Sequence, residues 1–291
     1  MRKSEQFYRM LKKKETSYIM EAHNALSGKI VENAGFKGIW GSGLSISASL
    51  GLRDNNEASW TDVMQVVEFM SDATQVPILL DADTGYGNFN NARMLVKKLE
   101  KLNVAAVCIE DKAFPKTNSF INGEKQKLAD VDEFCGKIKA MKDTQTDPFF
   151  SVVARTEAFI TGMGTNEALR RAHAYKDAGA DAIFVHSKMD TACEIIDFMN
   201  NWDSECPVII APTTYINTDP EVFKNCGVRI VIWANFMLRA SIYQMQNVAK
   251  KIYEKRSAAF LENEIVPLMD VFELQNVAEL QEAEKKYLPC K

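Results

Sequence analysis

The chain has 291 residues, of which 46% are hydrophobic and 25% are charged, as in globular proteins large enough to bury a core. Its net charge of −4 argues against the basic surface that nucleic acids and anionic membranes attract. No apolar run approaches the roughly 20 residues of a membrane span. We therefore expect no nucleic acid and no membrane among its partners.

The cysteines indicate the compartment. There are six of them, none forms a C-x-x-C pair, and the polar start of the chain lacks the apolar core of a secretory signal. We expect free thiols in a cytoplasmic protein, with Cys108 as inert core inside a strand. The six are Cys108, Cys135, Cys193, Cys206, Cys226 and Cys290.

Apolar patterning predicts strands and helices that alternate along the chain. Short apolar runs predict eight strands, at 18–22, 38–40, 78–80, 104–109, 149–154, 182–185, 207–211 and 228–233. One-faced apolar stripes predict helices at 4–14, 25–34, 59–73, 92–102, after Asp130 and at 165–176. Asp130 and Thr165 are the expected N-terminal caps of the last two helices.

Eight strands that alternate with helices predict the α/β class and a (β/α)₈, or TIM, barrel. No internal repeat or linker divides the chain, so residues 1–291 are expected to form a single barrel domain. The region 238–291 has a helical pattern and no further strand. It is too long for the eighth barrel helix alone, and we expect this C-terminal helical region to pack on another subunit.

Acidic residues end two neighbouring predicted strands. The strand at 78–80 leads into Asp81-Ala82-Asp83, and the strand at 104–109 leads into Glu110-Asp111-Lys112. If the first strand stays extended through Asp83, Asp81 and Asp83 point the same way. Several carboxylates at one spot favour a hard divalent cation, Mg²⁺ or Mn²⁺.

Other polar residues also end predicted strands, where a barrel places its active site. Any one of them could be polar only because it meets water, but their recurrence favours a common site. They are Trp40, Ser42, Arg155, His186, Thr213 and Asn235, beside the acidic residues.

Two of these residues have more than one interpretation. Arg155 follows an apolar run, so it needs an anion, either a substrate phosphoryl or carboxylate group or the protein carboxylates Glu157 or Glu110. His186 is either a core histidine or a donor to a bound anion. The turn Gly41-Ser42-Gly43 offers backbone N–H groups to an anion. The polar connection at 111–129 has the length of a lid or a disordered loop.

Several motifs in this chain together resemble the phosphoenolpyruvate mutase family of the isocitrate lyase superfamily over essentially the whole chain. They are Glu21-Ala22-His23-Asn24, Trp40-Gly41-Ser42-Gly43, Asp81-Ala82-Asp83-Thr84-Gly85-Tyr86-Gly87-Asn88, Glu110-Asp111-Lys112 and Phe114-Pro115-Lys116-Thr117-Asn118-Ser119. The resemblance implies a barrel whose eighth helix is exchanged between subunits, a homotetramer built as a dimer of dimers, and Mg²⁺. It implies interconversion of phosphoenolpyruvate and phosphonopyruvate, which forms the carbon–phosphorus bond in phosphonate biosynthesis.

The resemblance also implies roles for individual residues. Asp81 corresponds to the direct metal ligand, with Asp83 and Glu110 acting through metal-bound water. Asp54 corresponds to the residue beside the migrating phosphorus, either a covalent nucleophile or a group that orients a metaphosphate-like species. The pyruvyl part is expected to contact Trp40, Ser42, Gly43, Leu44 and Ser119, and the phosphoryl part Arg155, His186 and Asn118. Lys116 is a further expected catalytic residue, within a gating lid that excludes water.

Relatives within the superfamily offer alternative functions. Isocitrate and methylisocitrate lyases carry Lys-x-Cys-Gly-His in this loop, whereas the present loop reads Lys116-Thr117-Asn118-Ser119, which disfavours carbon–carbon cleavage of that type. Phosphonopyruvate hydrolase is the nearer alternative, and it carries threonine where Asn118 stands, so Asn118 favours the mutase. A non-catalytic binding barrel would be expected to lack Asp54, Asp81 or Arg155, and all three are present.

Overall fold

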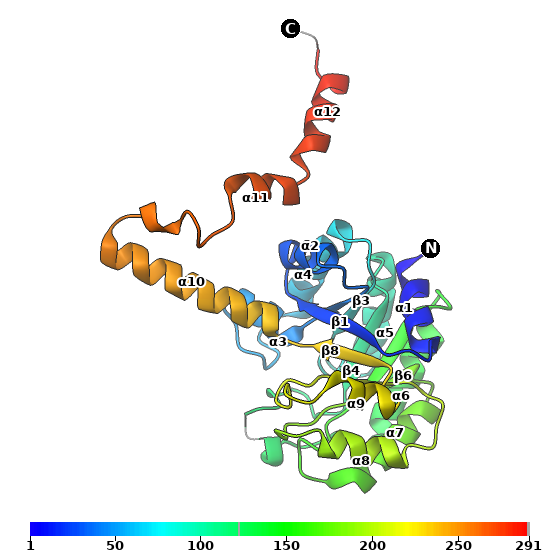
Figure 1. Ribbon diagram of the computed structural model, residues 1–291. Helices are drawn as coiled ribbons and strands as arrows, with labels where there is room; N and C mark the ends of the chain where they lie inside the picture. The colour runs from blue at the N-terminus through cyan, green and yellow to red at the C-terminus, as the bar shows by residue number, and fades with distance from the viewer. Residues whose placement is uncertain (122, 290–291) are drawn as a thin grey trace. The chain divides into compact units, whose positions relative to one another are not determined.

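Eight parallel strands close into a barrel in a computed structural model that describes residues 1–121 and 123–289. The strands follow one another around the barrel in chain order, with helices outside them (Figure 1). They are β1 (Ser17–Ala22), β2 (Ile39–Gly41), β3 (Ile78–Asp81), β4 (Ala106–Glu110), β5 (Ser151–Thr156), β6 (Ala182–Val185), β7 (Val208–Ile210) and β8 (Ile230–Trp233). The predicted (β/α)₈ barrel is confirmed.

Helices occupy the connections between strands. Before and within the barrel they are α1 (Lys3–Lys12), α2 (Ala25–Asn33), α3 (Gly43–Ser49), α4 (Trp60–Ala73), α5 (Phe89–Lys101), α6 (Val131–Thr144), α7 (Gly164–Asp177), α8 (Cys193–Asn201) and α9 (Pro220–Asn225), with a 3₁₀ turn η1 (Gly123–Lys125). Each predicted strand and helix corresponds to one of these elements, with bounds shifted by a few residues. Helices α3, α8 and α9 were not predicted individually.

Alternate residues of each strand fill the barrel interior, where Ile19, Leu79, Val153 and Ile232 are fully buried. Cys108 lies in this core as expected, and burial raises the pKa of its thiol well above the usual range. Parallel pairing sets the strands level with each other at their C-terminal ends. Polar residues that follow the apolar layers therefore meet above the core.

One predicted helix start is wrong. Helix α7 begins at Gly164, and its N-cap is Met163, which makes no side-chain cap. Thr165 instead lies inside the first turn, and its hydroxyl donates to the carboxylate of Asp197 on α8. A capping residue precedes the first helical residue, and Thr165 is already inside the helix. Asp130 does cap α6, accepting from the backbone N–H groups of Asp132 and Glu133.

The contacts divide the chain into two compact units, Met1–Phe236 and Met237–Lys291. The second unit contains most of α10 (Phe236–Lys255), followed by the 3₁₀ turn η2 (Ala259–Leu261), α11 (Leu268–Leu274) and α12 (Val277–Tyr287). The region is helical as predicted, although it is broken into several pieces. Its expected packing on a partner subunit stays a prediction.

The structure describes residues 1–121 and 123–289, and two expectations from the sequence concern helices and cysteines in this part of the chain. No helix in this part of the chain combines the length and the apolar character that crossing a bilayer requires. The cysteines at positions 108, 135, 193, 206 and 226 are free thiols, and Cys290 lies outside the described residues.

Candidate active site

A pocket lies at the C-terminal ends of the strands, and most of the predicted site residues line it. The predicted residues in its wall are Trp40, Ser42, Leu44, Asp54, Asp81, Lys116, Asn118, Ser119, Arg155 and His186. Strand ends, the segment after α3 and the connection after β4 all contribute to this wall. Three predicted residues, Gly43, Asp83 and Glu110, do not line the pocket but lie directly behind lining residues.

The two aspartates after β3 converge, but not as an extended strand would place them. The strand ends at Asp81, and Asp83 adopts the left-handed conformation with φ of 52°. Alternation of side chains holds only within a strand, so it does not account for the convergence of Asp81 and Asp83. Both carboxylates nevertheless approach Gly43. The backbone N–H of Gly43 lies 3.4 Å from Asp81 Oδ2.

The predicted small-residue turn at 41–43 is the start of a helix. Ser42 is the N-cap of α3, and its side chain accepts a hydrogen bond from the backbone N–H of Ser45. Gly43 is the first residue of that helix, so its N–H is one of those that the helix leaves unpaired. The first turn of α3 thus faces the acidic end of β3.

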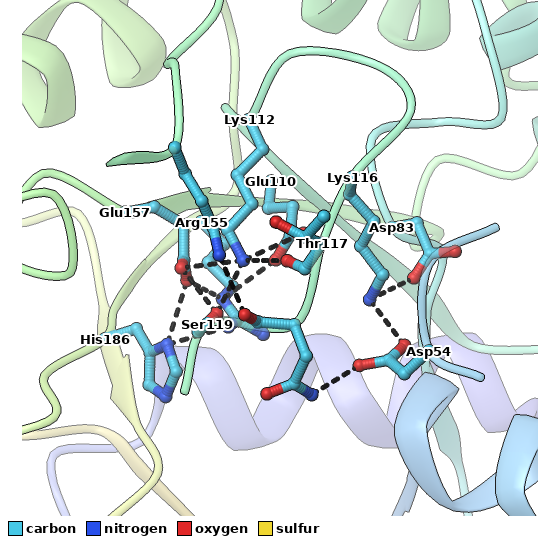
Figure 2. Close-up of polar contacts among 12 residues, drawn as sticks. Asp54, Asp83, Glu110, Lys112, Lys116, Thr117, Ser119, Arg155, Glu157 and His186 are labelled. Carbon is cyan, nitrogen blue, oxygen red and sulfur yellow. Dashed lines mark hydrogen bonds and ion pairs between the residues drawn. The ribbon is translucent and has the colours of Figure 1, made fainter. Parts of the chain in front are cut away.

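Lys116 pairs with two of the acidic residues. Its Nζ lies 2.5 Å from Asp83 Oδ1 and 2.9 Å from Asp54 Oδ1, and Figure 2 shows the ammonium between them. Burial would lower the pKa of Lys116, but Asp83, Glu110 and Asp54 raise it well above its ordinary value. Lys116 is therefore a fixed positive charge at neutral pH. Asn56 supports the pair by donating from Nδ2 to Asp83 Oδ2 at 2.7 Å.

Asp54 is held as an ionised carboxylate that faces the pocket. Burial would raise its pKa, but the charge of Lys116 and hydrogen bonds from Lys116 and Asn118 lower it below the ordinary value. Asn118 Nδ2 donates to Asp54 Oδ2 at 2.6 Å, and Asn118 Oδ1 accepts from the backbone N–H of Phe120 at 3.0 Å. The second contact fixes which way the amide points. Segment 115–120 thereby meets the loop that carries Asp54.

Arg155 lies in a buried ionic cluster, where it pairs with protein carboxylates and also lines the pocket. Its Nε lies 2.5 Å from Glu157 Oε1 and 3.4 Å from Glu110 Oε2. Its Nη2 lies 2.7 Å from His186 Nδ1. Both sequence-based interpretations of Arg155 therefore apply, because its guanidinium pairs with Glu157 and also forms part of the pocket wall. The surrounding carboxylates raise its pKa against the effect of burial.

His186 is neutral at ordinary pH and its hydrogen bonding depends on Arg155. Burial and the charge of Arg155 lower its pKa, opposed by Glu157. A guanidinium only donates, so when His186 Nδ1 accepts from Arg155 the ring proton lies on Nε2. Figure 2 shows Nε2 on the far side of the ring from the Arg155–Glu157 contacts. The histidine can therefore donate from Nε2 to an anion in the pocket.

Some buried carboxylate oxygens at the site lack a hydrogen-bond or ion-pair partner among the described residues, although burial makes an unpaired oxygen costly. Within residues 1–121 and 123–289, no lysine or arginine nitrogen forms an ion pair with Asp81, and Glu110 Oε1 has no hydrogen-bond partner. Burial raises the pKa of Asp81, against the charges of Lys116 and Arg155. Burial, only partly offset by Lys116, raises the pKa of Asp83 to about 7. Buried, underpaired oxygen ligands of this kind suit a hard divalent cation.

As they stand, these carboxylates do not form a complete chelate. In the described part of the chain, no three His, Cys, Asp or Glu side chains are arranged to hold an ion. Asp83 pairs with Lys116, and Glu110 lies beside Arg155 and Lys112. Asp81 alone of the predicted metal residues lines the pocket, so the residue types fit a cation that contacts Asp81 directly and the other two less directly.

Several residues that complete the site were not predicted from the sequence. Phe120, Phe184, Ala211 and Ala234 line the pocket, as do Thr213 and Asn235, which were noted only as strand ends. Phe120 packs edge-to-face against His186, with ring centroids 5.7 Å apart. Phe120 lies in a connection without a periodic signal, whereas Phe184 lies in β6, where an apolar residue is expected only to fill the core. The sequence indicates a place near the site only through position: Phe120 lies close to Asn118, and Ala211 and Ala234 directly follow strands.

The barrel and its pocket define a (β/α)₈-barrel enzyme that acts on a small anionic molecule, since fixed cations and carboxylates converge where such barrels bind substrate. A family model described as phosphoenolpyruvate phosphomutase matches residues 7–253. The chain belongs to that family.

Individual relatives agree with this assignment. Phosphoenolpyruvate phosphomutase of Tetrahymena pyriformis is 56% identical over 287 residues, covering 99% of this chain and 96% of that protein. The crystal structure of phosphoenolpyruvate phosphomutase from Streptomyces platensis subsp. rosaceus has a TM-score of 0.96 at 43% identity, covering 98% of this chain and 99% of that one. Phosphonopyruvate hydrolase in complex with oxalate and Mg²⁺ has a TM-score of 0.93 at 33% identity, covering 99% of this chain and 100% of that one.

Proposed function

We propose that this protein interconverts phosphoenolpyruvate and phosphonopyruvate, a phosphoryl transfer that forms a carbon–phosphorus bond and supplies phosphonate biosynthesis. The observation that carries the proposal is the contact between Asn118 and Asp54 in a pocket that also contains Arg155 and His186. The higher identity to mutases than to the hydrolase supports it. A cytoplasmic location fits this metabolic role.

In this proposal Asp81 holds a divalent cation, Mg²⁺ or Mn²⁺, with Asp83 and Glu110 behind it. The relative solved with oxalate and Mg²⁺ supports the choice of ion. When bound, such an ion orients a three-carbon acid and neutralises negative charge on its oxygens. Trp40, Ser42, Gly43 and Leu44 surround the pyruvyl part, and Ser119 closes over it.

Arg155 and His186 bind the phosphoryl group from one side, and Asp54 approaches it from the other. Asp54 is ionised, so it can receive or orient a phosphoryl group that has left its donor atom. Asn118 and Lys116 hold its carboxylate in place. Segment 115–120 covers the pocket, which keeps water from the transferring group. Without that cover, phosphate release would compete with transfer.

Phosphonopyruvate turnover gives the direct test. With Mg²⁺ present, we expect phosphorus NMR to record loss of phosphonopyruvate and growth of phosphoenolpyruvate, because the pocket retains the phosphoryl group until it reaches oxygen. Reactions without protein, and reactions with EDTA in excess over Mg²⁺, serve as controls. Inorganic phosphate as the main product would assign the protein to the hydrolase reaction instead. No turnover at all would contradict both functions.

Gly43→Ala tests the proposed metal residues. A Cβ at Gly43 would stand 3.2 Å from both Asp81 Oδ2 and Asp83 Oδ1, so at least one carboxylate must move. We expect the Mg²⁺ concentration for half-maximal turnover to rise about 10-fold or more. Gly136→Ala is the matched control, because a Cβ there meets no atom within 4 Å. An unchanged Mg²⁺ requirement in Gly43→Ala would argue against metal binding by these aspartates.

We also propose a homotetramer, arranged as a dimer of dimers, in which the C-terminal helices pack on a second copy. Large apolar side chains of this region are exposed, among them Leu268, Met269 and Leu280. Helices α11 and α12 contain no buried residue in the described chain. Helices of this length gain most of their stability from packing, so an apolar surface elsewhere is needed to cover them.

A further inference from the structure

Glu157 is a buried carboxylate that contacts several residues of the pocket, although it does not belong to the pocket wall. Its side chain is fully buried and makes four polar contacts. Two involve Arg155 and His186, and two involve Lys112 and Ser119 (Figure 2). A buried carboxylate is stable only when its charge is matched, and here three cationic or potentially cationic groups surround it. Burial would raise the pKa of Glu157, but Arg155, Lys112 and His186 hold it well below the ordinary range.

The two carboxylate oxygens divide these contacts by origin. Oε1 faces the strand-end residues. It accepts from Arg155 Nε at 2.5 Å and lies 2.9 Å from His186 Nδ1, which itself accepts from Arg155 Nη2, so Glu157 positions the histidine through the guanidinium. Oε2 contacts the connection after β4, with Ser119 Oγ at 2.6 Å and Lys112 Nζ at 3.2 Å. One rigid carboxylate therefore joins the residues that face the anion to the segment that covers them.

Segment 115–120 is joined to the barrel partly through this contact. Ser119 Oγ donates to Glu157, while Lys112 Nζ donates to the backbone carbonyl of Thr117 at 2.9 Å and to Ser119 Oγ at 2.6 Å. Lys112 is itself buried and pairs with Glu157. Without the Glu157 charge, the lysine and the serine would lose this partner, and the segment would be held only on its other side, where Lys116 and Asn118 contact Asp54.

Glu157 is fixed in turn by a buried layer behind it. Its backbone N–H donates to Asp111 Oδ1 at 2.8 Å. Asp111 Oδ2 accepts from Tyr175 Oη at 2.6 Å and from Arg171 Nη1 at 3.1 Å. Asp111 adjoins Lys112 in sequence, so the same layer anchors the start of the covering connection. Such support determines the precision of a site as much as the contacting residues do.

We propose that Glu157 is a positioning residue that couples closure of segment 115–120 to the orientation of Arg155 and His186. The coupling works through the shared carboxylate, because a closed segment and correctly placed anion-binding groups both require it. The expected effects on turnover rest on the proposed function, because they are measured with phosphonopyruvate. It also has a consequence that needs no turnover, since closure can be followed directly.

Glu157→Gln keeps the shape of the side chain and removes its charge. We expect kcat to fall about 10- to 100-fold, the range for a supporting residue. We also expect a larger fraction of phosphonopyruvate to appear as inorganic phosphate than in the unmodified enzyme, because an open segment admits water. Asp181→Asn is the matched control. Its carboxylate pairs with Lys142 at 2.8 Å and accepts from the Val152 N–H, outside the pocket, and its kcat and product ratio should stay unchanged.

Tryptic cleavage measures closure independently of the reaction. Lys112, Lys116, Lys125 and Lys127 are the possible cleavage points in this connection. With oxalate and Mg²⁺ present, we expect cleavage here to slow in the unmodified protein and in Asp181→Asn, but not in Glu157→Gln. Slowed cleavage with no turnover of phosphonopyruvate would uphold the coupling while overturning the proposed function. Equal protection of Glu157→Gln, with unchanged kcat, would overturn the coupling.

Ser119→Ala provides a second test that does not depend on changing the buried charge of Glu157. It removes the hydroxyl that donates to Glu157 and accepts from Arg155 Nη2 at 3.1 Å, and it leaves the charges of Glu157 and Arg155 in place. If Glu157 couples the two sides, the double variant should lose no more activity than Glu157→Gln alone, because the two changes interrupt one connection. Losses that multiply would show that the two residues act independently, and the proposal would be wrong.

Discussion

Asp54→Ala is expected to lower kcat by about 10⁴-fold or more, the scale seen when a group that reacts directly is removed. Its carboxylate is ionised, faces the pocket and is held by Lys116 and Asn118. None of these contacts supports the barrel core. Lys116 keeps Asp83 as a partner after the change, so fold stability should fall only modestly. The binding of Mg²⁺ with oxalate should change little. Thermal unfolding and calorimetric titration would measure both.

Asp54→Asn separates the two roles that the sequence leaves open. Asparagine keeps the size of the side chain and can still hydrogen-bond to Asn118, but it is a far weaker nucleophile. A covalent role predicts that Asp54→Asn is as inactive as Asp54→Ala, whereas an orienting role predicts partial activity. Glu57→Gln is the matched control, because Glu57 lies in the same loop and pairs with exposed Arg53. Turnover by Asp54→Ala near the unmodified rate would refute a direct role.

The parts of this site that sequence predicted are those dictated by the barrel itself. Apolar runs gave the strands, and a parallel barrel brings all their C-terminal ends together, so Asp81, Arg155 and His186 had to converge. The register places Glu110 directly beside Arg155 on neighbouring strands. Their ion pair therefore follows from topology.

Residues in loops could not be predicted in this way. Asp54 and Asn118 lie outside any periodic element, and only the family resemblance identified them. The left-handed backbone of Asp83 is a local choice that an Asp-Thr-Gly stretch permits without requiring. Glu157 was noted only as a possible partner of Arg155. Its importance comes from Lys112 and Ser119, whose approach depends on the path of a connection that has little regular structure.

Arg155→Met is the second change with a very large expected effect. The guanidinium is the pocket cation best suited to a phosphoryl group, since its donors are fixed in a plane and it stays charged at every working pH. We expect kcat/KM for phosphonopyruvate to fall about 10³- to 10⁵-fold, the scale of an arginine that stabilises a transferring phosphoryl group. Steady-state kinetics at saturating Mg²⁺ would measure it.

Stability should fall further here than at Asp54, because Arg155 pairs with two buried carboxylates. Arg155 neutralises Glu157 and Glu110 in a cluster that is almost completely buried. Removing one partner of a buried pair typically costs about 3–5 kcal/mol in the free energy of unfolding. Denaturant unfolding at neutral pH would measure the loss. Because Lys112 remains beside Glu157, we expect the lower part of that range.

Arg155→Lys isolates the geometry from the charge. A lysine ammonium could still neutralise Glu157, so most of the stability should return relative to Arg155→Met. It cannot contact Glu157, His186 and a phosphoryl group at once, as the forked guanidinium can. We therefore expect activity to stay about 10²- to 10³-fold below the unmodified enzyme. Full activity in Arg155→Lys would mean that only a positive charge is needed here, and the proposed recognition of the phosphoryl group by a planar fork would be wrong.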